Sequence, residues 1–225
     1  ARDGLLEPVL LAAEEQTAGR GRMGKGWHSK AGQSLTFSLA LPLAPADWSG
    51  LSLAVGVSLA GSLHPDVRLK WPNDLWLQER KLGGILVETA GIGDGAAAPR
   101  TVVIGVGINI ARPDAAAVQS PPAPGAAAAM PPAGLAEVRM GVTAGETLAL
   151  VAPALVRDVL RFGADGFSAF GHRFAQRDAL QGRAVRLTDG TEGIADGVDA
   201  QGALRLLTGQ GLRTVHSAEV SVRPC

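Results

Sequence analysis

Gln16-Thr17-Ala18-Gly19-Arg20-Gly21-Arg22-Met23-Gly24-Lys25-Gly26-Trp27 is the most informative stretch of the sequence. It holds four glycines, three cationic side chains and one indole, and it has no hydrophobic face that a core could use. Glycine lets a backbone approach a ligand closely and adopt positive φ. Successive backbone N–H groups in such turns form a concavity that binds anions. We therefore predict that this loop binds a phosphate or a carboxylate; the alternative is a solvated basic loop.

Two nucleotide-binding motifs match parts of this stretch by letter. Residues 19–24 fit the dinucleotide fingerprint, and residues 19–25 fit the start of a Walker phosphate loop. Each motif needs a preceding strand and a helix that begins directly after it. Residues 8–13 can form the strand, but residues 26–34 have the composition of a loop, and Gly26 stands where a Walker loop needs a hydroxyl for magnesium. The sequence context therefore excludes both motifs.

The composition indicates a globular protein without a strong net charge. The chain has 225 residues, a formal net charge of zero and a hydrophobic content of 46%. It is long enough for one medium domain, or for one domain with a small second one. A neutral chain has no overall field that attracts nucleic acid or membrane phosphates, so we expect neither as a partner. The one cysteine, Cys225, permits no disulfide within the chain, which suits a reducing, cytoplasmic location.

The N-terminal residues do not read as a signal peptide, and no apolar run reaches the roughly 20 residues of a membrane span. The sequence opens almost directly on a predicted strand and a functional loop, so we expect that part of the protein precedes Ala1. Positive charge is carried mostly by arginine, and lysine occurs only at positions 25, 30, 70 and 81. Lysine is a compact charge on a flexible stem, so these positions are candidates for specific roles.

Several strands and a helix follow the loop. Residues 35–41 alternate as a strand that Pro42 stops, and Asp47 or Ser49 can cap a helix from about residue 50 to 63. Residues 67–71 form a strand before a turn, and residues 75–77 and 81–88 form a hairpin. This arrangement places Lys70 and Lys81 on neighbouring antiparallel segments. The two glycines at 83 and 84 weaken their strand, which indicates that something approaches the backbone there.

Residues 101–110 form a nearly continuous β-branched run and should be a buried central strand. Asn109 is its one long polar side chain, and a buried Asn needs hydrogen-bond partners. It either ties down a neighbouring loop or meets a ligand. Residues 111–142 are rich in Ala and Pro and cannot bury enough surface to order themselves, so we predict a flexible insert without chemistry.

The C-terminal third is predicted to hold two helices followed by short strands. Thr143 and Glu146 have the spacing of a capping box, and apolar residues then recur at helical intervals to Phe162; Pro153 implies a kink or a later start. A second helix is expected at about residues 167–177. From Gly182 onward, five short apolar runs alternate with turns, which is typical of a small β-barrel. We therefore predict two domains, residues 1–178 and residues 179–225.

Few residues suit acid–base or metal chemistry. The four histidines lie far apart in the sequence without metal-ligand spacing, and the adjacent Glu14 and Glu15 would point to opposite faces of a strand. What remains is three cationic points: the loop with Arg20 and Arg22, then Lys70, then Lys81. Fixed cations lower the barrier when a carboxylate attacks the α-phosphate of a nucleotide, because they stabilise the charge that builds up.

Four segments together resemble the signature segments of the biotin protein ligases, in the same order. They are EQTAGRGRMGK at residues 15–25, KWPND at 70–74, KLGGILVE at 81–88 and IGVGIN at 104–109. The resemblance covers residues 8–110 strongly and the C-terminal part by architecture. It implies an α+β fold: a mixed sheet with helices, as in class II aminoacyl-tRNA synthetases, followed by a small SH3-like barrel. It also implies that biotin and MgATP give biotinyl-5′-AMP, and that a lysine of a biotin carboxyl carrier protein then takes the biotin.

The resemblance also assigns roles to residues. Lys70, Arg20, Arg22 and Lys81 would be catalytic, with Lys70 acting on the carboxylate and the α-phosphate. The residues that would bind biotin are Gln16, Gly19, Arg20, Gly21, Arg22, Lys81, Gly83 and Gly84. The residues that would bind the nucleotide are Arg22, Trp27, Lys70, Asn73, Asp74 and Asn109. The sequence does not identify the ligands of a metal.

The chain departs from the resemblance in two places. Met23 stands where a third arginine is common, and the Ser-Thr-Asn segment that normally comes before this start is absent. Two other functions stay open at this point: a biotin-sensing transcriptional regulator, and a lipoate or octanoate ligase of similar fold. The sequence also leaves a homodimer open.

Overall fold

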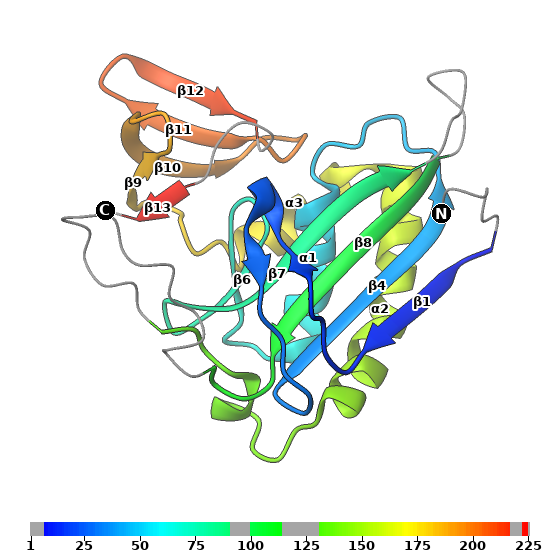
Figure 1. The fold of residues 1–225 in the computed structure, drawn as a ribbon. Coiled ribbons are helices and arrows are strands. Elements are labelled where there is room, and N and C mark those ends of the chain that lie inside the picture. Colours follow the sequence, from blue (N-terminus) through cyan, green and yellow to red (C-terminus); the bar gives the residue numbers. More distant parts are fainter. Residues whose placement is uncertain (1–6, 91–99, 114–130, 217–221, 225) are drawn as a thin grey trace.

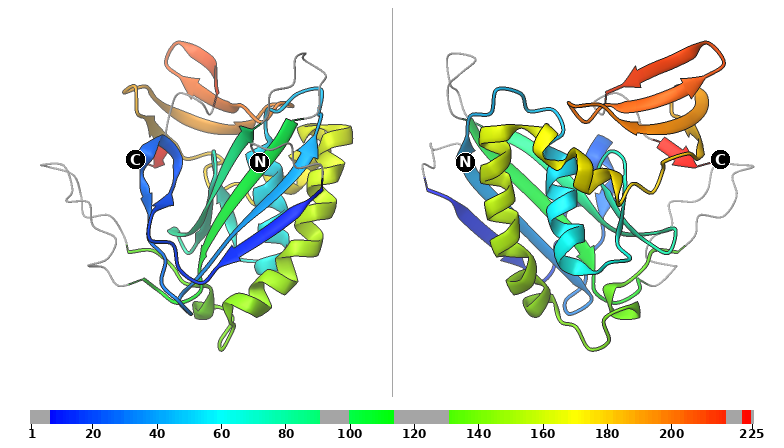
Figure 2. Two further views of the ribbon diagram at one scale, coloured as in Figure 1. Left: turned by 45° about the vertical axis from the view of Figure 1, so that its right-hand side comes forward. Right: turned by 180° about the vertical axis from the view of Figure 1, so that it is seen from behind.

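A computed structural model describes residues 7–90, 100–113, 131–216 and 222–224. The larger of its sheets has six strands in the order β1-β4-β8-β7-β6-β5, and every neighbouring pair is antiparallel. Two long helices, α1 and α2, lie side by side and cover one face of this sheet (Figures 1 and 2). The strands are β1 (Val9–Ala13), β4 (Ser34–Leu43), β5 (Arg68–Lys70), β6 (Asp74–Leu77), β7 (Arg80–Ala90) and β8 (Arg100–Asn109).

The prediction of a buried central strand at residues 101–110 is confirmed. β8 pairs with β4 from Ser34–Asn109 to Leu43–Arg100, and its other edge pairs with β7. The prediction that Pro42 stops the preceding strand is wrong, because β4 continues to Leu43. Pro42 lies beyond Ala40, the last residue of β4 that pairs with β1, so its missing N–H removes no bond to that strand.

α1 (Leu51–Leu63) is buried on almost every side because it packs against both the sheet and α2. The prediction of a cap from Asp47 or Ser49 is wrong: the N-cap is Gly50, at a φ of 79°, and no side chain caps the helix. A Cβ at Gly50 would lie 2.6 Å from Phe167, so close packing requires glycine at this position. Asp47 instead accepts a hydrogen bond from the Ser49 N–H at 2.8 Å.

α2 (Ala144–Asp165) begins at the predicted capping box. The Glu146 N–H donates to the Thr143 hydroxyl at 3.2 Å, and the Thr143 N–H donates to the Glu146 carboxylate at 2.9 Å. The helix runs through the exposed Pro153, so it has no later start. A short turn, η4 (Phe167–Phe170), and α3 (Gly171–Ala175) then form in the region where the second helix is predicted.

The hairpin of β6 and β7 confirms the prediction around residues 75–88. Its turn residues Gln78 and Glu79 have positive φ of 50° and 64°, as two-residue hairpin turns require. Lys70 and Lys81 are not on neighbouring strands, however. β6 lies between β5 and β7, because the turn after Lys70 reverses the chain and inserts a strand there.

The insert prediction is wrong for residues 131–142. Ala133 and Leu135 are completely buried, and η3 (Leu135–Glu137) places the Glu137 carboxylate on the Arg80 guanidinium. Burial and a paired charge therefore hold this segment on the hairpin although its composition is rich in Pro and Ala. Residues 114–130, and the connection at 91–99, lie outside the described residues.

The five predicted C-terminal strands form a second, smaller antiparallel sheet in the order β12-β11-β10-β9-β13, at one end of the larger sheet (Figure 1). This agrees with the predicted SH3-like unit. The boundary at residues 178 and 179 stays a prediction, because one hydrophobic cluster includes residues of both parts. The strands are β9 (Ala184–Leu187), β10 (Glu192–Val198), β11 (Leu204–Thr208), β12 (Gly211–Val215) and β13 (Val222–Pro224).

Candidate active site

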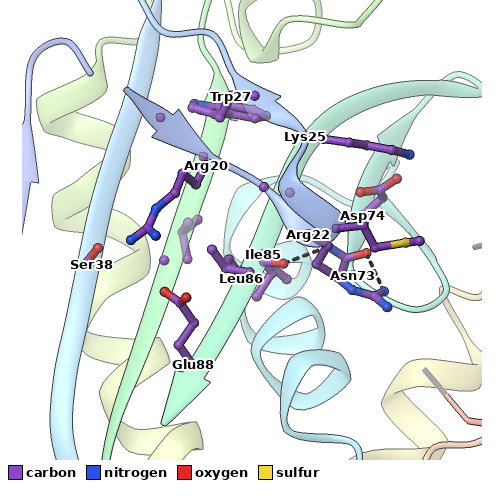
Figure 3. A pocket seen from close by; sticks show the side chains of 18 of the residues that line it. Arg20, Arg22, Lys25, Trp27, Ser38, Asn73, Asp74, Ile85, Leu86 and Glu88 are labelled. Atoms are coloured by element: carbon purple, nitrogen blue, oxygen red, sulfur yellow. Dashed lines mark hydrogen bonds between the residues drawn. The ribbon is translucent and has the colours of Figure 1, made fainter. Parts of the chain in front are cut away.

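A cavity of about 450 Å³ lies on the face of the larger sheet that the two helices leave uncovered. β4, β7 and β8 form its floor, and the loop of residues 16–27 crosses above them (Figure 3). The turn at residues 70–74 closes one end of the cavity. The loop, the turn and three strands, from five parts of the sequence, therefore converge on one site.

The floor of the cavity is bare backbone at its centre. Gly105 of β8 is the direct cross-strand partner of Ser38 on β4 and of Leu86 on β7. A Cβ at Gly105 would lie 3.6 Å from the Leu86 carbonyl oxygen, so the space above this glycine is open but narrow. At Gly107 the space is already filled, because a Cβ there would come within 2.4 Å of the Trp27 ring. The floor thus offers a shallow seat beside an indole, which suits a flat apolar ring.

The loop above the floor is itself a small hairpin. β2 (Gly19–Arg20) pairs with β3 (Gly26–Trp27), and the Gly21 N–H donates to the Lys25 carbonyl oxygen at 2.7 Å. A Cβ at Gly19 would lie 2.4 Å from the Trp27 carbonyl oxygen, so only glycine fits there. A strand, not a helix, follows the glycines, which agrees with the exclusion of both nucleotide-binding motifs.

Arg22 connects this loop to the turn at the end of the cavity. Its guanidinium donates to the Asn73 Oδ1 at 3.3 Å, and the Asn73 amide donates to the Ile85 carbonyl oxygen at 2.7 Å (Figure 3). Burial lowers the pKa of Arg22, and the charge of Asp74 partly opposes this shift. An arginine still stays protonated at neutral pH. A partly desolvated cation therefore faces the cavity.

Two lysines share one carboxylate at the same end. The Lys81 Nζ lies 2.7 Å from Asp74 Oδ1, and the Lys70 Nζ lies 3.9 Å from Asp74 Oδ2. Lys70 also lies over the Trp76 ring, 5.4 Å from its centroid. Because one anion offsets two lysines and Arg22 is close by, this end of the cavity carries net positive charge.

Most residues predicted for the site line the cavity, and two do not. Those that do are Gln16, Gly19, Arg20, Gly21, Arg22, Trp27, Lys70, Asn73, Asp74, Lys81 and Gly84. Gly83 faces the neighbouring strand instead, since a Cβ there would lie 2.5 Å from the Gly107 carbonyl oxygen. Asn109 is buried, and its amide donates to the Ala133 carbonyl oxygen at 3.1 Å, so it anchors a loop. Ligand contacts of Gly83 and Asn109 stay predictions.

Other lining residues carry polar or shape-defining groups that the sequence predictions do not include. They are Ser38, Leu86, Glu88 and Gly105, which come from three adjacent strands. Ser38 and Glu88 lie at the end of the cavity near Arg20 (Figure 3). The alternation of each strand suggests which residues share a face, but the register that brings these four together depends on long-range pairing.

Cations and glycine backbone dominate the chemistry that the cavity offers. Among the described residues, no three His, Cys, Asp or Glu side chains gather as a metal site would require. The described helices also include none with the length and apolar character of a membrane span. The arrangement suits a substrate that joins an apolar ring to an anionic group, together with a second anion.

Comparison with known proteins agrees with this geometry. The model of the biotin/lipoate A/B protein ligase family matches residues 5–109, and that of the biotin protein ligase C-terminal domain matches residues 181–223. A biotin–[acetyl-CoA-carboxylase] ligase of Paracoccus denitrificans is 36% identical over 96% of the chain and 91% of its own length. The chain belongs to the biotin protein ligase family.

Other relatives include the bifunctional ligase/repressor BirA of Escherichia coli, which is 37% identical over 94% of the chain. The chain spans 65% of the length of that relative. Among solved structures, the biotin protein ligase of Aquifex aeolicus in complex with biotin and ATP superposes with a TM-score of 0.74 at 27% identity, over 96% of this chain and 89% of that one. The predicted family and the predicted fold are thus both confirmed.

Proposed function

We propose that this member of the family is an ATP-dependent biotin ligase, which forms biotinyl-5′-AMP and transfers biotin to a lysine of a biotin carboxyl carrier protein. The observation that carries the proposal is the continuity of the cavity from the bare floor at Gly105 to the cations at Arg22, Lys70 and Lys81. The fused ring system of biotin would occupy the floor, with its ureido group toward polar side chains, and its acid chain would lead to the cations. The similarity to an Aquifex aeolicus ligase in complex with biotin and ATP supports biotin and ATP as the two ligands.

In the first step, a carboxylate oxygen of biotin attacks the α-phosphorus of ATP. The bond from that phosphorus to the bridging oxygen breaks, and pyrophosphate leaves with the bonding electrons. Both reactants are anions, so fixed cations in a partly desolvated site stabilise the charge as it builds up. We assign Lys70 to the carboxylate and the α-phosphate, and Lys81 to the biotin carboxyl group. Arginine can hold phosphate oxygens through two parallel hydrogen bonds, which suits Arg22, whereas Arg20, near Ser38 and Glu88, would contact biotin.

In the second step, the neutral ε-amine of the acceptor lysine attacks the acyl carbon of the adenylate. AMP leaves with the bonding electrons, and the nitrogen loses a proton to solvent as the amide forms. A mixed anhydride hydrolyses readily, so the loop of residues 16–27 would protect it from water until the acceptor binds.

The remaining assignments belong to the same proposal. Magnesium would enter with ATP, because phosphate oxygens and water are ligands that Mg²⁺ prefers. A cytoplasmic location would suit the single cysteine. The proposed biotin contacts are Gln16, Gly19, Gly21, Gly83 and Gly84, and the proposed nucleotide contacts are Trp27, Asn73, Asp74 and Asn109.

The test is pyrophosphate release from MgATP with biotin, lipoate or octanoate, in the absence of an acceptor protein. We expect release only with biotin, because the polar groups at both ends of a narrow cavity suit a ureido ring better than a dithiolane. Release only with lipoate or octanoate would keep the chemistry and change the substrate. Binding of biotin without any release would favour a sensor, a role compatible with the ligase/repressor relatives.

A further inference from the structure

One buried hydrogen bond joins the smaller sheet to the site. The indole Nε1 of Trp71 donates to the Gly202 carbonyl oxygen at 3.0 Å, and Trp71 is only 1% exposed. Trp71 lies in the chain between two residues that line the cavity, Lys70 and Pro72. Gly202 lies in the turn between β10 and β11, 131 residues after Trp71 in the sequence. The hydrogen bond between them therefore joins the smaller sheet to the residue next to Lys70.

The turn that carries Gly202 is closed by hydrogen bonds and closely packed. The Asp199 carboxylate accepts hydrogen bonds from the Gln201 and Ala203 N–H groups, both at 2.9 Å. Gly202 has a φ of 81°, and a Cβ on it would lie 2.9 Å from the Gly50 Cα at the start of α1. The turn of the smaller sheet therefore holds the Gly202 carbonyl group in place against Trp71, and its packing on Gly50 leaves it no room to shift toward α1.

The turn at residues 71–74 connects Trp71 to the charged side chains of the cavity through hydrogen bonds and ion pairs. Its Pro72 carbonyl oxygen accepts from the Ser52 hydroxyl at 3.3 Å, and the Ile85 N–H donates to the Asn73 carbonyl oxygen at 3.0 Å. Asn73 in turn holds Arg22, and Asp74 holds both lysines. Val222 of β13 also lines the cavity, so the smaller sheet contributes to the site at a second point.

We propose that Trp71 is a positioning residue for adenylate formation, which uses the Gly202 carbonyl group to fix the turn that carries Asn73 and Asp74. The inference rests on the proposed ligase function. It assigns to the smaller sheet a role in the first chemical step, before any acceptor protein binds. Of the proposed biotin contacts, only Lys81 is held by this turn, through Asp74, and the ring would bind over the floor at Gly105, so the contact should affect pyrophosphate release much more than biotin affinity.

The test compares Trp71→Phe, Gly202→Ala and the double variant. Phenylalanine keeps an aromatic ring and removes the N–H, while Gly202→Ala displaces the carbonyl group from the other side. Gly190→Ala is the matched control: Gly190 has a φ of 86° in a turn of the same sheet, but a Cβ there meets nothing within 4 Å. Single-turnover pyrophosphate release and the biotin dissociation constant are measured at a temperature at which circular dichroism shows every variant folded.

We expect each single variant to release pyrophosphate about tenfold more slowly, with biotin affinity within about twofold of wild type. The double variant should lose about as much as either single one, since both changes break one contact. Gly190→Ala should match wild type. If Trp71→Phe does not fold, Gly202→Ala alone decides.

Three results would overturn the inference, and they are distinguishable. An active wild-type chain with unchanged rates in both single variants would remove the positioning role and leave the ligase intact, as would losses that multiply in the double variant. A wild-type chain that binds biotin but releases no pyrophosphate would remove the proposed function, and the inference with it.

Discussion

Asp74 determines how the positive charge of the cavity is arranged. Its side chain is 17% exposed and contacts both lysines, the nearer of them at 2.7 Å. Without Asp74, the two long lysine side chains would lose a shared contact and sample more rotamers, and ordering them during the reaction would cost entropy. The carboxylate orders them in advance at the expense of one unit of positive charge, so we interpret Asp74 as an organiser of the two cations.

The variant Asp74→Asn tests whether Asp74 orders the two lysines, because asparagine has nearly the same shape but carries no negative charge. We expect ATP to bind within about threefold of wild type or more tightly, since the site becomes more positive, while pyrophosphate release slows by more than about tenfold. Equilibrium binding of ATP and single-turnover release measure the two effects. Asp66→Asn is the control, because Asp66 pairs with His64 at 3.7 Å and does not line the cavity. An unchanged rate in Asp74→Asn would contradict this role.

For single residues, the sequence motifs predict the charged side chains of the cavity better than they predict the residues of its floor. The cations at positions 20, 22, 70 and 81 follow from their types and from the order of the segments, and all four line the cavity. Gly105 and Ser38 do not follow, because β4 and β8 are far apart in the sequence and their register depends on the whole sheet. The mistaken adjacency of Lys70 and Lys81 has a related cause: the sequence predicts a hairpin strand at residues 75–77 but does not show that its other edge pairs with residues 68–70.

At the scale of an element, one ion pair holds the segment of residues 131–142 against the hairpin of β6 and β7. Arg80 is 9% exposed, and its guanidinium binds the carboxylate of Glu137 on η3. This hydrogen bond lowers the pKa of Glu137, against a smaller opposing effect of burial. The same segment supplies Ala133, whose N–H donates to the Lys81 carbonyl oxygen at 2.9 Å. The ion pair therefore also supports the backbone that carries Lys81.

Glu137→Gln should destabilise the protein in a pH-dependent way. A carboxyl group whose pKa is lowered on folding stabilises the native state above its ordinary pKa of 4.5, and this contribution is lost as the pH falls through the lowered value. We expect the thermal midpoint at pH 7 to fall by a few degrees, equivalent to about 1 kcal/mol. As the pH falls from 4.5 through the lowered pKa of Glu137, the midpoints of variant and wild type should converge.

The control for this prediction is Glu192→Gln. Glu192 and Arg186 form an exposed ion pair on the smaller sheet at 3.3 Å. Exposed pairs of this kind contribute little, so the change should stay below about 0.5 kcal/mol at pH 7. A gap between Glu137→Gln and wild type that persists unchanged into acid would mean that shape, not charge, holds the segment.

Local signals predict elements well where their ends are set by local chemistry. The capping box of α2 and the hairpin around Gln78 and Glu79 form as predicted, because their hydrogen bonds are within a few residues of each other. The cap of α1 is different, since contact with Phe167, more than a hundred residues later, selects Gly50. The folded end of the insert likewise depends on Arg80, a distant partner that composition does not reveal.

At the scale of the whole molecule, the sequence predicts two units and the structure joins them closely. The short apolar runs and turns that begin near residue 180 coincide with the strands of the smaller sheet, and no strand of one sheet belongs to the other. The contact between them is less visible in the sequence, because a tryptophan, a glycine and a phenylalanine form it from three distant segments. Phe167 illustrates this: it is buried against Gly50 and lies within reach of the Gly202 turn.

We therefore predict that the two sheets unfold in one transition. All four tryptophans precede residue 77, so indole fluorescence in urea reports on the larger sheet and, through Trp71, on its contact with the smaller one. Hydrogen exchange of peptides from β10 and β11 reports on the smaller sheet. A shared core and a buried hydrogen bond should give both probes the same midpoint and free energy of unfolding. Gly202→Ala should lower the protection of β10 and β11 more than that of β8, whereas Gly190→Ala should leave the two sheets coupled. Two separate transitions in the wild-type chain would show that the smaller sheet is an independent unit, and its contact with Trp71 would then be too weak to hold the turn that carries Asp74.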